Sequence, residues 1–108
     1  MKGIVWYKNR NIGFEKMRQI MEGYEMMDIG IKNSNLYQSQ NQITVEYTNG
    51  DIWKCVPAYE SMRGNRANIS LVERAIDRDF LLKVILPITF MPPYKACDFY
   101  GEGELGWR

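Results

Sequence analysis

The 108-residue chain contains no histidine, which removes the commonest general base of enzymes and most zinc sites. Its two cysteines, Cys55 and Cys97, are far apart and lack metal-site spacing, so two reduced thiols are favoured over a disulfide. Neither sign of charge is in excess, with 14 Lys and Arg against 13 Asp and Glu. The overall charge therefore gives no reason to expect binding to nucleic acid or to a membrane surface.

Long apolar runs are also missing from the chain. No run approaches the roughly 20 residues of a membrane span, and the N-terminal stretch "MKGIVWYKNR" has too short an apolar core for a secretory signal. We therefore expect a cytoplasmic protein with no membrane attachment. The 45% apolar and 25% charged fractions are ordinary for a globular chain, and the length suffices for one compact domain.

The first third of the chain predicts a strand followed by a helix. Residues 3–7, "GIVWY", form a short apolar run typical of a buried strand. Apolar residues at helical spacing predict an amphipathic helix from residue 12 to about residue 27, with Asn11 as its N-cap. The polar stretch "GIKNSNLYQSQN", residues 30–41, is expected to be a connection.

The stretch "QITVEYTNGDIWKCVPA" is a strong hairpin signal. Apolar and polar residues alternate over 43–47, Asn49-Gly50 predicts a type I′ turn, and Pro57 ends the second strand. The apolar run over residues 69–72 predicts a second short buried strand. A helix over residues 77–85 follows and is expected to stop at Pro87, although "KVILPITF" is also rich in strand-forming residues.

This order of elements predicts an α/β domain over residues 1–90, with a small mixed sheet, a β-hairpin and two flanking helices. The strands over 3–7 and 69–72 are expected to be central, parallel neighbours. Residues 91–108 contain two prolines and three glycines. They are expected to form an irregular tail whose aromatic side chains pack or mediate contacts.

The stretch "MRGNRAN" lies between the hairpin and the second buried strand. It is expected at a strand end, where α/β sheets bind their ligands. Arg63 and Arg66 flank Gly64, so two cations and a bare backbone could approach an anion together. On the residues alone, two solvated arginines on a surface turn are favoured.

From Ile43 to Pro87 the chain resembles the ATPase domain of phage terminase large subunits, the motors that package DNA into capsids. That family has a strand, a turn, a strand, an Arg-Gly-x-Arg-x-Asn stretch, an apolar Walker B strand ending in Asp-Glu, and a helix running to a proline. Here these parts read "TVEYTNGDIWKCVPA", "MRGNRAN", "ISLVERAI" and "DRDFLLKVILP". The segment "GIVWYKNRNIGFEKMRQIM" is similar to the strand and helix that follow the P-loop helix.

The resemblance implies a reduced RecA-like half-domain that lacks the catalytic parts. It places Arg63 where a terminase arginine can serve the nucleotide of a neighbouring subunit. The sequence contains no phosphate-binding P-loop, and Glu73 and Arg74 stand where the Walker B strand should end in two carboxylates. Glu73 could still hold a metal, but Arg74 cannot act as a base. We therefore expect no catalytic residues, no bound metal or cofactor, and no self-contained ATP hydrolysis.

Two non-catalytic functions fit these residues. The first is a phage- or prophage-derived protein that binds a partner protein, including a second copy of itself, because a trimmed sheet has edges to cover. The alternative is a small module for an anion, a nucleotide or single-stranded nucleic acid, with Trp53 or Tyr59 as a stacking surface. Its binding residues would be Arg63, Gly64, Arg66, Glu73 and Arg74.

An enzyme of an unrelated class is the third interpretation. Its candidate residues are Glu73, Asp77 and Asp79, but carboxylates beside arginines more often form solvated ion pairs. Cys55 has no histidine partner and lies in a predicted strand, so a core role is favoured over a nucleophilic one.

Overall fold

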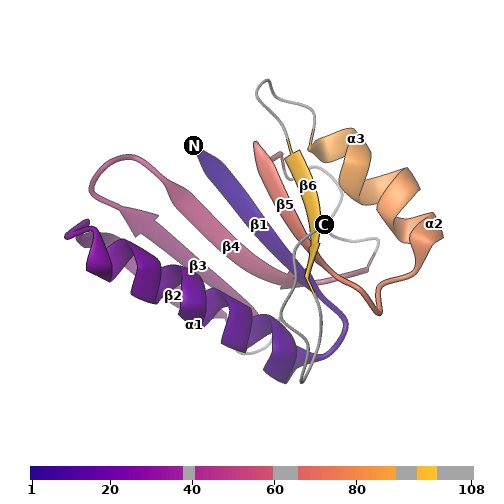
Figure 1. The fold of residues 1–108 in the computed structure, drawn as a ribbon, viewed down its shortest axis with the longest axis horizontal. Coiled ribbons are helices and arrows are strands. Elements are labelled where there is room, and N and C mark those ends of the chain that lie inside the picture. Colours follow the sequence, from indigo (N-terminus) through magenta and orange to yellow (C-terminus); the bar gives the residue numbers. More distant parts are fainter. Residues whose placement is uncertain (38–40, 60–65, 90–94, 100–108) are drawn as a thin grey trace.

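The computed structural model describes residues 1–37, 41–59, 66–89 and 95–99, with the backbone alone for Tyr37 and for 95–99. In this part of the chain, one six-stranded sheet has the order β2-β3-β4-β1-β5-β6 (Figure 1). Helix α1 (Arg10–Met26) follows the first strand, and a helical segment made of α2 (Arg78–Phe80), η3 (Leu81–Ile85) and α3 (Leu86–Ile88) precedes the last. The strands are β1 (Lys2–Tyr7), β2 (Ile31–Tyr37), β3 (Gln42–Tyr47), β4 (Ile52–Pro57), β5 (Ile69–Glu73) and β6 (Lys95–Phe99). The predicted mixed α/β class is confirmed.

Strand β1 lies at the centre of the sheet and is parallel to both of its neighbours. Ile4 is in register with Lys54 of β4 on one side and with Ser70 of β5 on the other. Ile4, Val5 and Trp6 are fully buried, as expected for a parallel strand covered on both faces. The prediction that residues 3–7 and 69–72 form central, parallel neighbours is confirmed.

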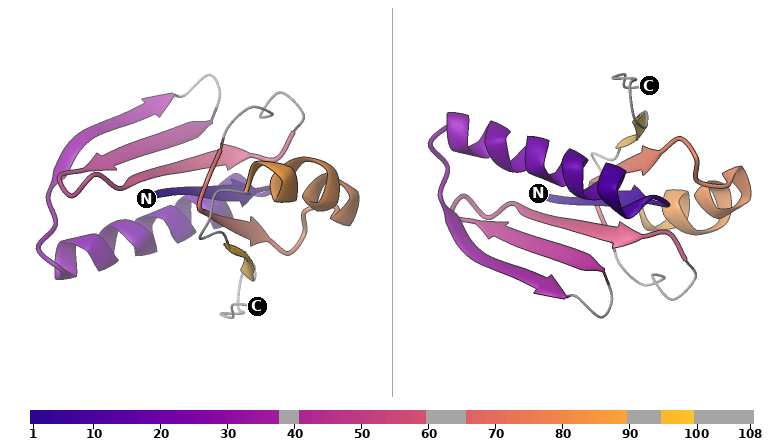
Figure 2. Two further views of the ribbon diagram at one scale, coloured as in Figure 1. Left: turned by 90° about the horizontal axis from the view of Figure 1, so that it is seen from above. Right: turned by 90° about the horizontal axis from the view of Figure 1, so that it is seen from below.

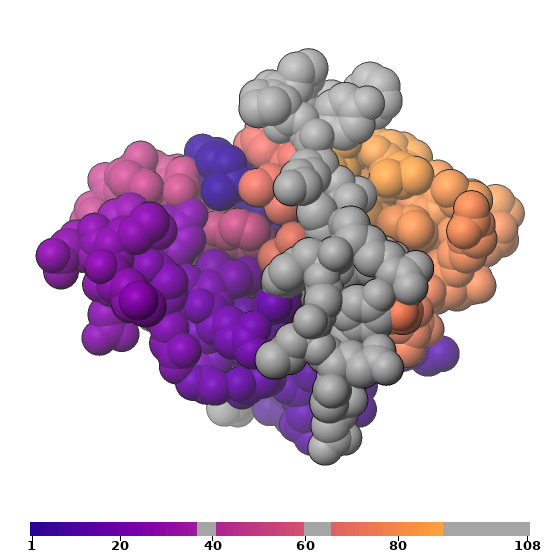
Figure 3. All heavy atoms as spheres, in the orientation of Figure 1, coloured from indigo at the N-terminus to yellow at the C-terminus, as the bar shows by residue number. Residues whose placement is uncertain are grey.

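The two faces of the sheet carry separate cores. Helix α1 covers one face, while the α2–α3 segment covers part of the other (Figure 2). The α1 side buries Val5, Tyr7, Met17, Tyr24, Val45, Tyr47, Trp53, Cys55 and Leu71. The other side buries Ile4, Trp6, Val56, Ala67, Val72 and Ile85. From the side drawn in Figure 3, α1, the β3–β4 hairpin and the α2–α3 segment form much of the described surface.

Helix α1 begins two residues earlier than the sequence pattern indicated. Its N-cap is Asn9, whose side chain accepts a hydrogen bond from the amide of Asn11 at 3.0 Å. The prediction of Asn11 as the cap is therefore wrong. Asn9 is the better cap because the chain turns immediately after β1 and its side-chain oxygen satisfies one of the open amides of the first turn.

The polar stretch over residues 30–41 is a strand for most of its described length, so the expected connection is wrong there. Strand β2 pairs antiparallel with β3, with Leu36 opposite Ile43 and Ser34 opposite Val45. Its sequence, IKNSNLY, has little strand propensity. Pairing with the strong β3 strand supplies the backbone hydrogen bonds that the residues by themselves do not favour.

The β3–β4 hairpin is confirmed, but its turn differs from the predicted type I′. The amide of Gly50 donates to the carbonyl of Tyr47 at 3.0 Å, and the amide of Tyr47 donates to the carbonyl of Asp51 at 2.8 Å. Gly50 has a positive φ of 95°, and Asn49 does not have a positive φ. This is a three-residue loop, in which an ordinary β-turn is followed by a left-handed glycine.

The C-terminal part departs from prediction twice. The helix does not stop at Pro87: helical backbone continues to Ile88, and a π-helical turn over Leu81–Ile85 ends two residues before the proline. A proline removes one amide donor, and helix irregularities are common beside it. The expected irregular tail is also wrong over β6, which pairs in parallel with β5. Residues 90–94 and 100–108 lie outside the described residues.

Candidate functional site

The carboxyl ends of β1 and β5 meet at Glu73, the last residue of β5. Its side chain is only 2% exposed. The Oε1 atom accepts hydrogen bonds from the backbone amides of Lys8, at 2.8 Å, and of Asn9, at 2.9 Å. Both amides lie in the short turn between β1 and α1, at the N-terminus of the helix. Glu73 therefore joins β5 to the start of α1.

This arrangement uses a position where α/β proteins commonly bind anions. The carboxyl end of a central parallel strand and the N-terminus of the following helix present amides and a partial positive charge. Here the carboxylate of Glu73 accepts hydrogen bonds from two amides at this position. The position is thus filled by a group of the chain itself, and Glu73 serves as a buried structural acceptor.

Arg66 and Arg74, two of the residues predicted to form an anion site, lie at opposite ends of β5. Arg74 is exposed and follows Glu73 at the carboxyl end of β5. Arg66 is exposed and precedes β5 at its other end, where Asn68 exchanges backbone and side-chain hydrogen bonds with Lys2. Four strand steps from Ile69 to Glu73 span roughly 13 Å at about 3.3 Å per residue. One small ligand cannot contact Arg66 and Arg74 closely at once.

Arg63 and Gly64 lie outside the described residues, so the expected convergence of Arg63, Gly64 and Arg66 is not described. Both residues that were predicted as a stacking surface for a base, Trp53 and Tyr59, are described. Trp53 is buried under α1, and its Nε1 donates to the hydroxyl of Tyr24 at 2.9 Å, so Trp53 offers no face to a base. Tyr59 is exposed.

The residues considered for an unrelated enzyme are also separated. Glu73 is buried, while Asp77 and Asp79 are exposed, and Asp79 forms an ion pair with Lys83 at 3.0 Å. Within the described ranges, no group of three or more His, Cys, Asp or Glu side chains could hold a metal ion.

Cys55 has the predicted core role. Its thiol is a free, fully buried group that donates to the carbonyl of Gly13 at 3.4 Å. Burial raises its pKa to about 12, so the nucleophilic thiolate is disfavoured at neutral pH. The geometry therefore gives Cys55 a role in the packing of α1 on β4.

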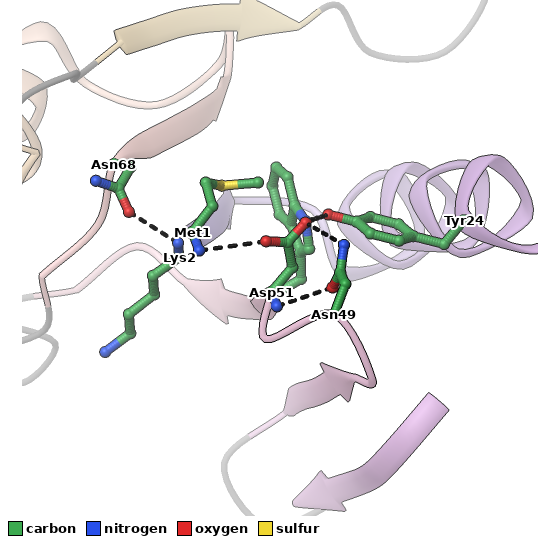
Figure 4. Close-up of polar contacts among 7 residues, drawn as sticks. Met1, Lys2, Tyr24, Asn49, Asp51 and Asn68 are labelled. Atoms are coloured by element: carbon green, nitrogen blue, oxygen red, sulfur yellow. Dashed lines mark hydrogen bonds and ion pairs between the residues drawn. The ribbon is translucent and has the colours of Figure 1, made fainter. Parts of the chain in front are cut away.

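A polar network at the opposite end of the sheet gathers around Asp51 (Figure 4). Its carboxylate accepts from the hydroxyl of Tyr24 at 2.6 Å and from the side-chain amide of Asn49 at 3.2 Å, and it lies 3.2 Å from the amino group of Met1. The hydrogen bond from Tyr24 is the largest influence that holds the pKa of Asp51 below its usual value. The network ties the hairpin turn to α1 and β1.

Two surface features were missed by the sequence reasoning. One is the exposed edge formed by β2, hidden because its polar sequence predicted a connection. The other is a hollow on the sheet face opposite α1, lined by Lys2, Asn33, Asn35, Thr44, Glu46, Ile52 and Lys54. The alternation of apolar and polar residues in β3 and β4 indicates which side chains share a face of the sheet. It does not indicate that the side chains of this face border a hollow.

No family model matches the chain, and no curated protein or solved structure does so either. The terminase resemblance therefore stays a prediction. In the part of the chain that the structure describes, no helix has the length and apolar character needed to cross a membrane.

Proposed function

We propose that this chain is a non-catalytic protein that works in the cytoplasm by binding a partner protein through the edge strand β2. The partner that the surface fits best is a second copy of the same chain. A phage or prophage origin is what the resemblance to terminase ATPase domains implies. The observation that carries the proposal is the exposed outer edge of β2.

Strand β2 forms one edge of the sheet, far from the α2–α3 segment (Figures 1 and 2). Over the described residues it pairs with β3 alone, and Ile31 to Leu36 are all exposed. The strand is seven residues long, contains no proline, and carries one charged residue, Lys32. Proteins usually protect such edges with charges, prolines, bulges or covering segments. The irregularity of β2 lies at its start, between Ile31 and Asn33, so the regular stretch that follows is suited to pair with another strand.

The register of β2 favours a second copy as the partner. Ile31 lies opposite Tyr47, and Leu36 lies opposite Ile43. Tyr47 and Ile43 both belong to the core beneath α1, so Ile31 and Leu36 share that face of the sheet. They are 50% and 51% exposed. A register shift between Ile31 and Asn33 puts Ile31 on the same face as Leu36, although the two residues are an odd number of positions apart. In an antiparallel pairing of two β2 strands that keep this irregularity, Ile31 of each copy can face Leu36 of the other, which covers both side chains.

The junction between α1 and β2 adds further apolar surface on the approach to this edge. Met26 and Met27, at the end of α1, are 86% and 60% exposed. Methionine side chains adapt readily to a partner's surface. Together with Ile31 they provide apolar area that a second copy can bury.

The position of Glu73 supports the non-catalytic part of the proposal. A carboxylate at the Walker B position would need to face a metal or a water in an ATPase. Here it is held by two backbone amides, at 2.8 and 2.9 Å. A phosphate-release assay with ATP and Mg²⁺ tests this part: turnover that disappears in an Arg63→Ala variant would contradict it.

Sedimentation velocity over a wide concentration range tests the strand pairing. The wild-type chain should shift from monomer to dimer as its concentration rises. The double variant Ile31→Lys, Leu36→Lys should remain monomeric, because the antiparallel pairing would place like charges opposite each other. Circular dichroism should show that the variant keeps its fold, since both positions are exposed.

The matched control is Leu82→Lys, which places a lysine at an exposed apolar position on η3, away from the edge. This variant should dimerise like the wild type. A chain that stays monomeric at every concentration, or a dimer that survives the double substitution, would overturn the proposed pairing.

A further inference from the structure

A hollow of about 510 Å³ lies on the sheet face opposite α1. Thr44, Glu46 and Lys54 line it, whereas the alternate residues of β3 and β4 point into the core beneath α1. The volume lies within the range of about 300–1,000 Å³ that is typical of small-molecule sites. Six of its seven lining residues are polar or charged, so the hollow offers hydrogen-bond donors and acceptors to an occupant.

The lining residues form two rows across the sheet. In one row, Asn35 is in register with Thr44, and Thr44 is in register with Lys54. In the other row the register runs through Asn33, Glu46, Ile52 and Lys2. The two lysines are therefore diagonal neighbours on adjacent strands. Adjacent strands are about 4.8 Å apart and two strand steps span about 6.6 Å, so the backbones of these residues are about 8 Å apart, within the reach of long side chains.

The two lysines place positive charge in a partly enclosed position. Lys54 is half-buried. Burial, and then the positive charge of Lys2, lower the pKa of Lys54. Both ammonium groups would attract an anion placed between them. The carboxylate of Glu46, the acidic group of the hollow, lies 3.9 Å from Lys32 at the far side of the same row.

We propose that this hollow binds a small phosphorylated ligand that carries hydroxyl groups, such as a sugar phosphate, with its phosphate between Lys2 and Lys54. A phosphate can carry two negative charges and has several acceptor oxygens, which matches two point-charge ammonium groups. A carboxylate is better matched by the planar fork of an arginine. The side-chain amides of Asn33 and Asn35 and the hydroxyl of Thr44 supply further donors. Asn33 donates to Glu46 at 3.4 Å, and the carboxylate of Glu46 has further acceptor capacity for a ligand hydroxyl.

This site is independent of the proposed β2 pairing. Asn33 and Asn35 lie on the opposite face of β2 from Ile31 and Leu36, because they are in register with Glu46 and Thr44. A dimer formed along the edge therefore leaves the hollow open. Either proposal can fail without the other.

Titration of the full-length chain with inorganic phosphate and with ribose 5-phosphate, followed by amide NMR shifts at fixed ionic strength, tests the site. Both probes should give saturable shifts at Thr44, Glu46 and Lys54, and ribose 5-phosphate should bind more tightly. Lys2→Gln and Lys54→Gln should each weaken binding at least about tenfold, since a hydrogen bond to a charged group is worth about one power of ten or more. Glu46→Gln should weaken the binding of ribose 5-phosphate and leave the binding of inorganic phosphate unchanged.

Lys83→Gln is the matched control, because Lys83 is an exposed lysine on η3, outside the hollow. It should leave both affinities unchanged. The proposal is overturned if neither probe gives saturable shifts, if the shifts map outside the hollow, or if Lys83→Gln weakens binding as much as Lys54→Gln. Should Lys54→Gln fail to fold, Lys2→Gln and Glu46→Gln decide the question in the same way.

Discussion

The carboxylate of Glu73, the last residue of β5, accepts a hydrogen bond from the backbone amide of Lys8, the first residue beyond β1, at 2.8 Å. The same oxygen accepts from the amide of Asn9. Two amides at the start of α1 are thereby satisfied by a residue 64 and 65 positions away in the chain. The bond fixes the turn between β1 and α1 against the neighbouring strand.

Replacement of Glu73 by alanine should therefore destabilise the fold. We expect Glu73→Ala to lower the free energy of unfolding by about 1–3 kcal/mol, because buried amides would lose their acceptor. Glu73→Gln should be milder, since its side-chain oxygen can still accept. Urea denaturation measures both. Glu25→Ala, at an exposed position of α1, should change little, and an equal loss there would contradict the assigned role.

The stacked rings of Tyr24 and Tyr47 offer a second test. Their centroids are 3.9 Å apart and their planes differ by 10°. The Tyr24 hydroxyl donates to Asp51 and accepts from Trp53, while the buried Tyr47 hydroxyl has no hydrogen-bond partner among the described residues. Tyr24→Phe should lower the free energy of unfolding by about 1–3 kcal/mol, because Trp53 and Asp51 lose a partner.

Tyr47→Phe is the matched control for Tyr24→Phe. It keeps the stacked ring and removes only a buried hydroxyl that lacks a partner, so stability should be unchanged or should rise. Thermal denaturation compares the two variants directly. A Tyr47→Phe chain that loses as much stability as Tyr24→Phe would mean that the Tyr47 hydroxyl has a partner after all.

The Asp51 network predicts a specific acid sensitivity. The folded-state pKa of Asp51 lies below its usual 3.8, first because of the Tyr24 hydrogen bond and further because of the Met1 amino group and Asn49. A lowered carboxyl pKa contributes stability that is present above the unfolded-state pKa and is lost as the pH falls through the folded-state pKa. The stability that Asp51 contributes should therefore begin to fall at about pH 4 and should fall further below it.

Asp51→Asn measures this contribution. At neutral pH the variant should be less stable than the wild type, and the difference should shrink as the pH falls below about 4. Urea denaturation at a series of pH values provides the comparison. A difference that stays constant down to the lowest pH would show that the charge on Asp51 does not stabilise the fold.

Replacement by alanine should have opposite effects on stability at two glycines of α1. A Cβ at Gly13 would lie 2.5 Å from the ring of Tyr7, whereas a Cβ at Gly23 would have no neighbour within 4 Å. Gly13→Ala should therefore push α1 away from β1 and lower the free energy of unfolding by about 1–3 kcal/mol. Gly23→Ala should raise it by about 0.5–1 kcal/mol through helix propensity.

Differential scanning calorimetry on both glycine variants gives the comparison. The helix propensity gain applies to both positions, so the difference between the variants isolates the contact of α1 with β1. A Gly13→Ala chain as stable as Gly23→Ala would mean that α1 does not pack closely on Tyr7.

The candidate site was only partly predictable from the sequence. The burial of Cys55 followed from its place in an alternating strand. The grouping of Arg66 with Glu73 and Arg74 did not hold, because the segment before β5 leads to its amino end while Glu73 closes its carboxyl end. Chain direction alone places Arg66, which precedes β5, and Arg74, which follows it, at opposite ends of this strand, so their separation was predictable from the order of the residues.

Local patterns in the sequence were enough to predict β1, β5, the β3–β4 hairpin and the main body of α1. Each of these has its own local signal, whether a continuous apolar run, period-two alternation with a turn glycine, or helical spacing of apolar residues. Tertiary contacts were needed to define strands β2 and β6, the hydrogen bonds from the turn before α1 to Glu73, and the hollow beside Lys54. Each of these depends on groups far apart in the chain, which only the assembled sheet brings within hydrogen-bonding or contact distance.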